Sequence, residues 1–194
     1  MADLGRAALI VAFGLALYAA LGGGLAAFQG RRRLHESARN ALVGAFAATA
    51  VAAVVLLDAL HARDFTYTYV AEHSSKKLPF PYSFTAFWGG QEGSLLLWLL
   101  VLTGLGSLAV VLNRELIRRL LPWTVPVLGA IASFFALLLV FVSSPFTRQV
   151  APPDGSGLVP SLQNPYMMIH PPLLYIGYVG MTIPFAFAAG ALLS

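Results

Sequence analysis

Five long apolar stretches alternate with polar segments along the chain of 194 residues. An α-helix needs about 20 mostly apolar residues to cross the roughly 30 Å hydrocarbon core of a bilayer, and each stretch is about that long. The pattern therefore predicts an all-α fold, a polytopic helical membrane protein with about five transmembrane helices in a single membrane domain, 1–194. The expected spans cover about residues 7–28, 41–60, 94–112, 122–142 and 171–193.

The positions of the basic residues predict which side each loop faces. The basic residues of the two short connecting segments, 29–40 and 113–121, are Arg31, Arg32, Arg33, Arg39, Arg114, Arg118 and Arg119. The longer segments 61–93 and 143–170 hold four Lys or Arg residues together. Because cytoplasmic loops are enriched in Lys and Arg, we expect the two longer segments and the N-terminus to lie outside. Most of the positive charge near the first span follows it, which indicates a retained helix and not a cleaved signal peptide.

Composition supports a membrane protein and removes several kinds of chemistry. Apolar residues make up 58% of the chain and charged residues 10%, whereas about a quarter of a soluble domain is charged. The chain has no cysteine, which excludes disulfides, thiolate metal sites and a CxxC redox pair. No Walker loop, HExxH motif or Ser/His/Asp set is evident, so hydrolysis and phosphoryl transfer have no support. The net charge of +4 lies in loops beside the spans and indicates orientation, not nucleic-acid binding.

His170 stands directly before Pro171 and Pro172, at the outer edge of the last span. Proline is tolerated in the first turn of a helix and disfavours helical backbone at the preceding residue, so we expect the helix to begin at Pro171 and His170 to be extended. A restrained neutral imidazole beside apolar surface suits a metal ligand, especially for haem iron. From the local sequence alone, an interfacial histidine bonded to lipid headgroups or a loop carbonyl is the favoured interpretation, because a lone histidine is weak evidence of a ligand. Further along the span, Pro184 predicts a kink.

The outer segments hold further candidate contacts. Trp88, in the stretch PYSFTAFWGGQEGSLLLW, is a candidate to stack on a planar ligand, although aromatic anchors at membrane interfaces are common. Lys76 and Lys77, with Arg63 or Arg148, are candidates to neutralise ligand carboxylates, and a solvated loop face explains the same charges. The turn-rich segment PPDGSG, residues 152–157, predicts a structured lid over the outer face.

Two long blocks of sequence resemble a known family. DFTYTYVAEHSSKKLPFPYSFTAFWGGQEGSLLLW, residues 64–98, and GLVPSLQNPYMMIHPPLLYIGYVG, residues 157–180, are similar to the N-terminal part of the CcmF family, the haem lyase component of the cytochrome c maturation system. The resemblance covers essentially the whole chain. The related lyase for nitrite-reductase assembly shares both blocks and stays open as an alternative.

The resemblance implies a multi-pass protein of the inner (cytoplasmic) membrane whose functional face is periplasmic or extracytoplasmic. There it would hold haem b for thioether attachment to the CxxCH cysteines of apocytochrome c. The histidine of the family's IHPP block is an outer axial haem ligand, which assigns His170 to the haem iron. The implied partners are a haem carrier protein, apocytochrome c with its thiol-reducing and presenting subunits, and the lipid bilayer.

The chain departs from the family pattern after its last span. The family's Trp-rich haem-contact segment, its second outer axial histidine and the histidines for a membrane-embedded haem are expected beyond Ser194. We therefore expect a split subunit or a truncated product that is part of a lyase complex but inactive without a polypeptide carrying the missing portion, and we assign no catalytic residue. The competing interpretation is a small-molecule transporter or accessory membrane subunit. A transporter needs a substrate path, and the spans contain hardly any charged residues that could line one.

Overall fold

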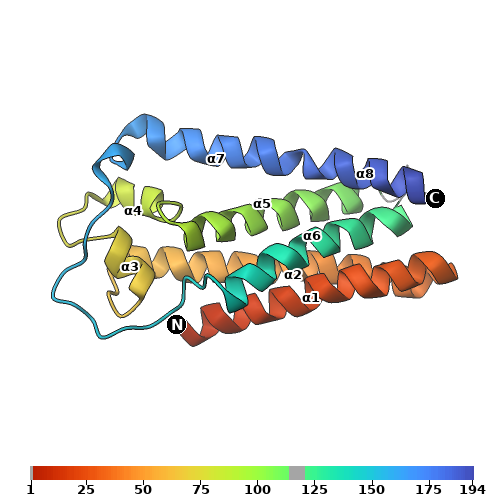
Figure 1. Ribbon diagram of the computed structural model, residues 1–194, viewed down its shortest axis with the longest axis horizontal. Helices are drawn as coiled ribbons and strands as arrows, with labels where there is room; N and C mark the ends of the chain where they lie inside the picture. Colours follow the sequence, from red (N-terminus) through yellow and green to blue (C-terminus); the bar gives the residue numbers. More distant parts are fainter. Residues whose placement is uncertain (1, 114–120) are drawn as a thin grey trace.

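The protein forms a bundle of long helices with a layer of short elements at one end (Figure 1). The computed structural model describes residues 2–113 and 121–194. The long helices are α1 (Ala2–Gln29), α2 (Arg32–Ala62), α5 (Gln91–Leu112), α6 (Leu121–Phe141), α7 (Pro165–Gly180) and α8 (Thr182–Leu193). The short elements are α3 (Thr68–His73), α4 (Phe80–Ala86) and the 3₁₀ turn η1 (Pro160–Leu162). Within the described residues, five helical segments, with α7 and α8 counted as one, are long and apolar enough to cross a membrane, which confirms the predicted fold class.

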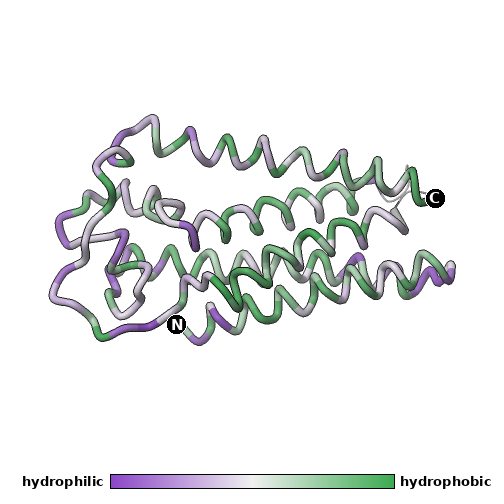
Figure 2. Tube along the Cα trace, viewed as in Figure 1, coloured by the Kyte–Doolittle hydropathy of each residue, from purple (hydrophilic) through white to green (hydrophobic). Residues whose placement is uncertain are grey.

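The two ends of the bundle differ in structure. We call the end that carries α3, α4 and residues 143–160 the loop end, at the left of Figure 1, and the opposite end the turn end. Both predicted outer segments lie at the loop end, as an up-and-down arrangement of the spans requires. Hydrophobic residues predominate along the long helices in Figure 2, and hydrophilic residues gather mainly at the two ends. The predicted basic residues Arg114, Arg118 and Arg119 lie outside the described residues.

The predicted loop over residues 29–40 is almost entirely helical. Helix α2 begins at Arg32, so that only Gly30, with φ +64°, and Arg31 connect it to α1. The Arg32 guanidinium donates to the Glu36 carboxylate at 2.8 Å, one helical turn further on. Pairs at this spacing favour the helix by about 0.2–0.5 kcal/mol. Hydropathy alone starts the second helix at about residue 41, nine residues after its true start at Arg32. A helix continues into water wherever its polar residues support it.

Small residues let α1 and α6 approach closely. Ala12, Ala16 and Ala19 of α1 are almost fully buried. At Gly129 of α6, a Cβ atom would lie 2.5 Å from the backbone nitrogen of Ala20. Backbone contact through small side chains is the usual way in which helices associate within a membrane, where lipid is as apolar as the side chains.

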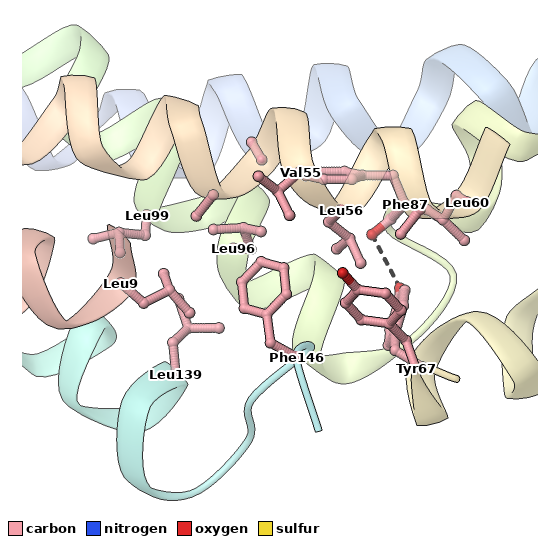
Figure 3. Packing of buried hydrophobic residues seen from close by; sticks show 14 of the residues in the cluster. Leu9, Val55, Leu56, Leu60, Tyr67, Phe87, Leu96, Leu99, Leu139 and Phe146 are labelled. Atoms are coloured by element: carbon pink, nitrogen blue, oxygen red, sulfur yellow. Dashed lines mark hydrogen bonds between the residues drawn. The ribbon is translucent and has the colours of Figure 1, made fainter. Parts of the chain in front are cut away.

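The main apolar cluster joins the long helices to the loop end (Figure 3). Leu9, Leu56, Leu96, Leu99 and Leu139, from α1, α2, α5 and α6, are each at most 1% exposed. Towards the loop end the cluster continues into two aromatic side chains, Tyr67 and Phe146, whose ring centroids lie 6.4 Å apart. The layer at the loop end is therefore packed on the bundle and shares its core.

The last span begins earlier than its prolines predict. Helix α7 starts at Pro165, where the Asn164 side chain accepts a hydrogen bond from the Tyr166 N–H at 2.9 Å. Asparagine at the N-cap followed by proline at the first helical position is a strong start signal, and it precedes the expected start at Pro171 by six residues. His170 is consequently helical, and the prediction of extended backbone there is wrong.

Proline also divides the last span further along the chain. Helix α7 ends at Gly180 and α8 begins at Thr182. Pro184 has no N–H to donate to the carbonyl of Gly180, four residues before it, which accounts for the interruption. This agrees with the kink that Pro184 predicts.

Candidate functional site

The two outer segments are joined by backbone hydrogen bonds at the loop end. The Thr68 N–H donates to the Thr147 carbonyl at 3.0 Å, and the Gln149 N–H donates to the Thr66 carbonyl at 2.8 Å. This short antiparallel contact is centred on Tyr67 and Arg148. It attaches the connection after α6 to the start of α3, so the two segments form one layer.

The predicted lid, residues 152–157, is ordered and lies against α3. The Asp154 carboxylate accepts hydrogen bonds from the backbone N–H groups of Lys76 and Gly155, both at 2.8 Å. The bond from Lys76 is the main reason that the pKa of Asp154 lies below its ordinary value. The Ser156 N–H donates to the Ala71 carbonyl at 2.7 Å. A Cβ atom at Gly155 would overlap the Ala71 and Ser74 carbonyl oxygens, so glycine is required for this close contact.

Tyr69 of α3 fixes the turn between α4 and α5. Its buried hydroxyl donates towards the carbonyl oxygens of Ala86 at 2.9 Å and Phe87 at 3.0 Å, and accepts from the Gly90 N–H at 3.1 Å. Burial raises the pKa of this phenol far above its ordinary value. The His73 ring stacks on Tyr69 with a centroid separation of 4.3 Å, and its Nδ1 lies 2.9 Å from the Tyr69 carbonyl oxygen, to which it donates.

Glycines in this turn are needed because other groups occupy the space of a side chain. A Cβ atom at Gly90 would overlap the His73 imidazole, and one at Gly93 would overlap the Phe87 carbonyl oxygen. At Gly89 a Cβ atom would lie 2.9 Å from Leu158 Cδ1, where the two recognised blocks of sequence meet. The sequence predicts a turn at Gly89 and Gly90 but not that Tyr69 holds it. The signal for the close packing is the density of glycines in WGGQEG, which is typical of close backbone approach.

Trp88 packs on this layer. Its side chain is half-buried against the main apolar cluster, and its carbonyl oxygen accepts from the Ser94 hydroxyl at 3.0 Å. The indole Nε1 is buried without a hydrogen-bond partner among the described residues. Because indole N–H groups usually find a partner when buried, Trp88 has one unused donor near the loop end.

His170 lies on the open face of α7. Val179 is the buried residue of this helix, and Tyr175 packs on Trp98 of α5 with ring centroids 5.8 Å apart. His170 is exposed, and the side chains one turn before and after it, Tyr166 and Leu173, are 82% and 59% exposed. Only 17% of the most apolar stretch of this span is buried, the lowest share of the five segments. The imidazole therefore faces away from α5, towards space that the described residues leave open.

The surroundings of His170 fit a haem. Leu173 and Leu174, at three and four residues after His170, share its exposed side of the helix, and nothing lies within 4 Å of a Cβ atom placed at Gly177, two turns on. An imidazole flanked by apolar side chains and a flat glycine position can accept a macrocycle. Among the described residues no group of three or more His, Cys, Asp or Glu could hold a bare metal ion. Haem iron already has four ligands from the macrocycle and needs only one or two side chains from the protein, so a single histidine can serve as one of them.

The other predicted contacts are spread over the loop end. Lys76 and Lys77 are exposed, and Arg63 uses its guanidinium to donate to the carbonyl oxygens of Lys76 at 2.6 Å and Leu78 at 2.8 Å. Arg63 therefore holds the loop in place. In the part of the chain that the structure describes, no hydrogen bond, ion pair or ring contact joins His170 to Trp88, Lys76, Lys77 or Arg148.

Arg148 lies apart from the last span. It pairs with Asp3 of α1 at 3.5 Å, and α1 lies across the bundle from α7 (Figure 1). The structure therefore does not bring Arg148 together with His170.

Comparisons with known proteins place this arrangement in context. The family model described as cytochrome C assembly protein matches residues 88–194. The cytochrome c-type biogenesis protein CcmF of Pseudomonas aeruginosa is 42% identical over 193 residues, which are 98% of this chain and 29% of that protein. The Escherichia coli protein of the same name is 37% identical over all of this chain and 30% of its own length. A solved structure, cytochrome c heme lyase CcmF, superposes with a TM-score of 0.83 at 32% identity and covers 99% of this chain and 30% of that one. The chain thus spans about 30% of the length of the curated relatives it matches.

Proposed function

Because the chain belongs to the cytochrome c assembly protein family, we propose that it is the haem-holding N-terminal portion of a cytochrome c haem lyase. The observation that carries this proposal is the exposed imidazole of His170, presented by α7 with apolar side chains and an open glycine position beside it. The match over residues 88–194 includes both this helix and the WGGQEG turn. The family assignment leaves the transporter interpretation without support.

In the proposed site His170 donates one nitrogen to the iron of haem b. Leu173, Leu174 and Gly177 provide the apolar surface along which the macrocycle lies. Trp88, Lys76 and Lys77 are proposed as further contacts, through the accessible part of the half-buried Trp88 and the two exposed lysines. None of them touches His170 in the described residues, so each would hold a part of the haem away from its iron. The haem supplies the vinyl groups to which the cysteine thiols of apocytochrome c add, and the chain supplies position.

We propose that the loop end faces the periplasm. Seven of the twelve Lys and Arg residues belong to the two segments that connect spans at the turn end, whereas six of the eight Asp and Glu residues lie in or beside the loop end. This distribution supports an inner-membrane protein with the turn end in the cytoplasm and the haem site outside. A haem carrier protein and apocytochrome c with its thiol-reducing and presenting subunits would then reach the site from the periplasmic side.

The proposed lyase also needs the portion of its relatives that these 194 residues do not cover. The relatives are about three times as long as this chain, and the open side of α7 is where their remaining portion would supply the second axial ligand. Its sequence would also carry the Trp-rich haem-contact segment. We therefore expect haem attachment to apocytochrome c from the assembled complex and not from these 194 residues alone.

The test is a haem spectrum of the protein produced together with the polypeptide that carries the remaining portion. We expect a haem absorption band in the wild type and its loss in His170→Ala, because an axial ligand is removed. Added imidazole should restore the band by filling the vacated position. Tyr166→Ala, one helical turn away and 82% exposed, is the matched control and should retain the band. Equal haem content in His170→Ala and wild type would refute the assignment.

A further inference from the structure

A recess lies at the loop end, on the side of the bundle away from α7. It has a volume of about 370 Å³ and lies between the start of α1, the end of α6 and the segment that follows α6. Arg6 of α1 and Arg148 both line it, although 142 positions separate them in the sequence. The recess belongs neither to the haem-facing side of α7 nor to the turn that Tyr69 holds.

The recess carries an excess of positive charge. Asp3 is the acidic residue among its lining side chains, and it pairs with Arg148 at 3.5 Å. Arg6 makes no hydrogen bond or ion pair with any other described residue. The N–H groups of Ala2 and Asp3 belong to the first turn of the 28-residue helix α1, whose N-terminal end adds a partial positive charge. Two guanidinium groups opposed by one carboxylate therefore favour an anion.

Part of the lining of the recess is apolar. Phe141 and Val142, where α6 ends, are 70% and 71% exposed. Both α1 and α6 are candidate membrane spans, and the recess lies at the ends of both, where the hydrocarbon core gives way to the headgroups. A lining that holds both arginines and apolar side chains matches the two halves of a phospholipid, whereas a soluble anion would use only the arginines. Arginine is also the side chain best suited to bind a phosphate through paired hydrogen bonds.

We propose that this recess binds an anionic phospholipid, with its phosphodiester between Arg6 and Arg148 and an acyl chain against Phe141 and Val142. The sequence suggests Arg148 as a partner for haem carboxylates, but its position beside α1 directs its charge to this recess. The assignment depends on the lining residues and is independent of the haem-binding proposal. The bound lipid would connect α1 to the end of α6.

The test is native mass spectrometry of the purified protein in detergent, titrated separately with phosphatidylglycerol, phosphatidylethanolamine and glycerol phosphate. We expect the first bound phosphatidylglycerol to be held more tightly than the other two probes. Each of Arg6→Gln and Arg148→Gln should weaken it about fivefold, and the double variant about thirtyfold, as expected for basic groups at a membrane surface. Lysine substitutions should retain most of the affinity because they keep the charge.

Two further variants separate lipid binding from a structural role. Arg33→Gln, an exposed arginine at the turn end, is the matched control and should leave this binding step unchanged. Asp3→Asn removes the opposing carboxylate and should tighten phosphatidylglycerol binding, although it breaks the ion pair with Arg148. The proposal is overturned if the double variant behaves like Arg33→Gln, or if glycerol phosphate binds as tightly as the lipid. The proposal is also overturned if phosphatidylethanolamine binds more tightly than phosphatidylglycerol and Asp3→Asn weakens the binding of phosphatidylethanolamine.

Discussion

Removing the hydroxyl of Tyr69 should destabilise the loop end by a predictable amount. In Tyr69→Phe the Gly90 N–H loses its partner at 3.1 Å, and the Phe87 carbonyl oxygen loses its donor at 3.0 Å. The Ala86 carbonyl keeps a hydrogen bond from the Gly89 N–H at 3.2 Å. Each of these two lost hydrogen bonds costs about 1–1.5 kcal/mol. We therefore expect the free energy of unfolding to fall by about 2–3 kcal/mol.

Tyr67→Phe is the matched control for this experiment. The Tyr67 side chain is 2% exposed and that of Tyr69 is 3% exposed, so both substitutions remove a hydroxyl from an equally buried ring. The Tyr67 hydroxyl makes no hydrogen bond among the described residues, and its loss should change stability by less than about 0.5 kcal/mol. Tryptophan fluorescence during heating in detergent should show a midpoint lower by about 5–10 °C for Tyr69→Phe only. Equal midpoints for the two variants would refute the reasoning.

The same residue predicts a pH effect. Burial raises the pKa of Tyr69 far above its ordinary value of 10.0. Below pH 10 the phenol is neutral in both the folded and the unfolded chain, so its contribution is fully present. As the pH rises further, the unfolded phenol loses its proton while the folded one keeps it, and stability falls. Unfolding midpoints measured above pH 10 should therefore fall more steeply in the wild type than in Tyr69→Phe.

Three other predictions concern packing, the lid and the turn. Gly129→Ala should lower the unfolding midpoint, because its Cβ would lie 2.5 Å from the Ala20 backbone nitrogen and overpacking costs about 1–3 kcal/mol. Gly14→Ala is the control and should leave the midpoint unchanged, because nothing lies within 4 Å of a Cβ atom there. Similar midpoints for the two variants would contradict the close α1–α6 contact. The stabilisation from Asp154 is present above its ordinary pKa of 3.8 and is lost as the pH falls through its lower folded value. Pepsin should therefore cut beside the buried Leu158, which follows residues 152–157, faster as the pH falls in the wild type, and Asp154→Asn should be cut quickly throughout; a pH-independent ratio of the two rates would count against this. Gly90→Ala should displace the His73 ring, visible as a changed imidazole NMR signal, and an unaltered signal would exclude that contact.

The sequence predicts the membrane spans better than their ends. Twenty apolar residues have one stable arrangement in a bilayer, so the five spans follow from length and hydropathy. The ends depend on local groups that hydropathy does not weigh. Arg32 and Glu36 extend α2 beyond its apolar part, and Asn164 with Pro165 starts α7 before the proline pair. A proline marks a helix start only where no better start signal precedes it.

The candidate site was predictable only in part, for a different reason. His170 stands out because its neighbours in the sequence are distinctive. Tyr69, Gly90 and Asp154 act through partners that lie far from them along the chain, and Asp154 accepts from Lys76 across 78 positions. No local pattern contains that pairing. Arg148 shows the same limit, because its charge suggested a ligand contact while its position depends on α1.

The two prolines inside α7 affect how His170 is held by the helix. Pro171 and Pro172 have no N–H groups to reach back to the carbonyls of Met167 and Met168. The turn that carries His170 is thus joined to the membrane-embedded part of the helix by two fewer hydrogen bonds than usual. Tilting that turn costs less than bending α7 elsewhere. The imidazole can therefore change its angle, as the proposed haem ligand would need to, while Tyr175 and Val179 stay packed in the bundle.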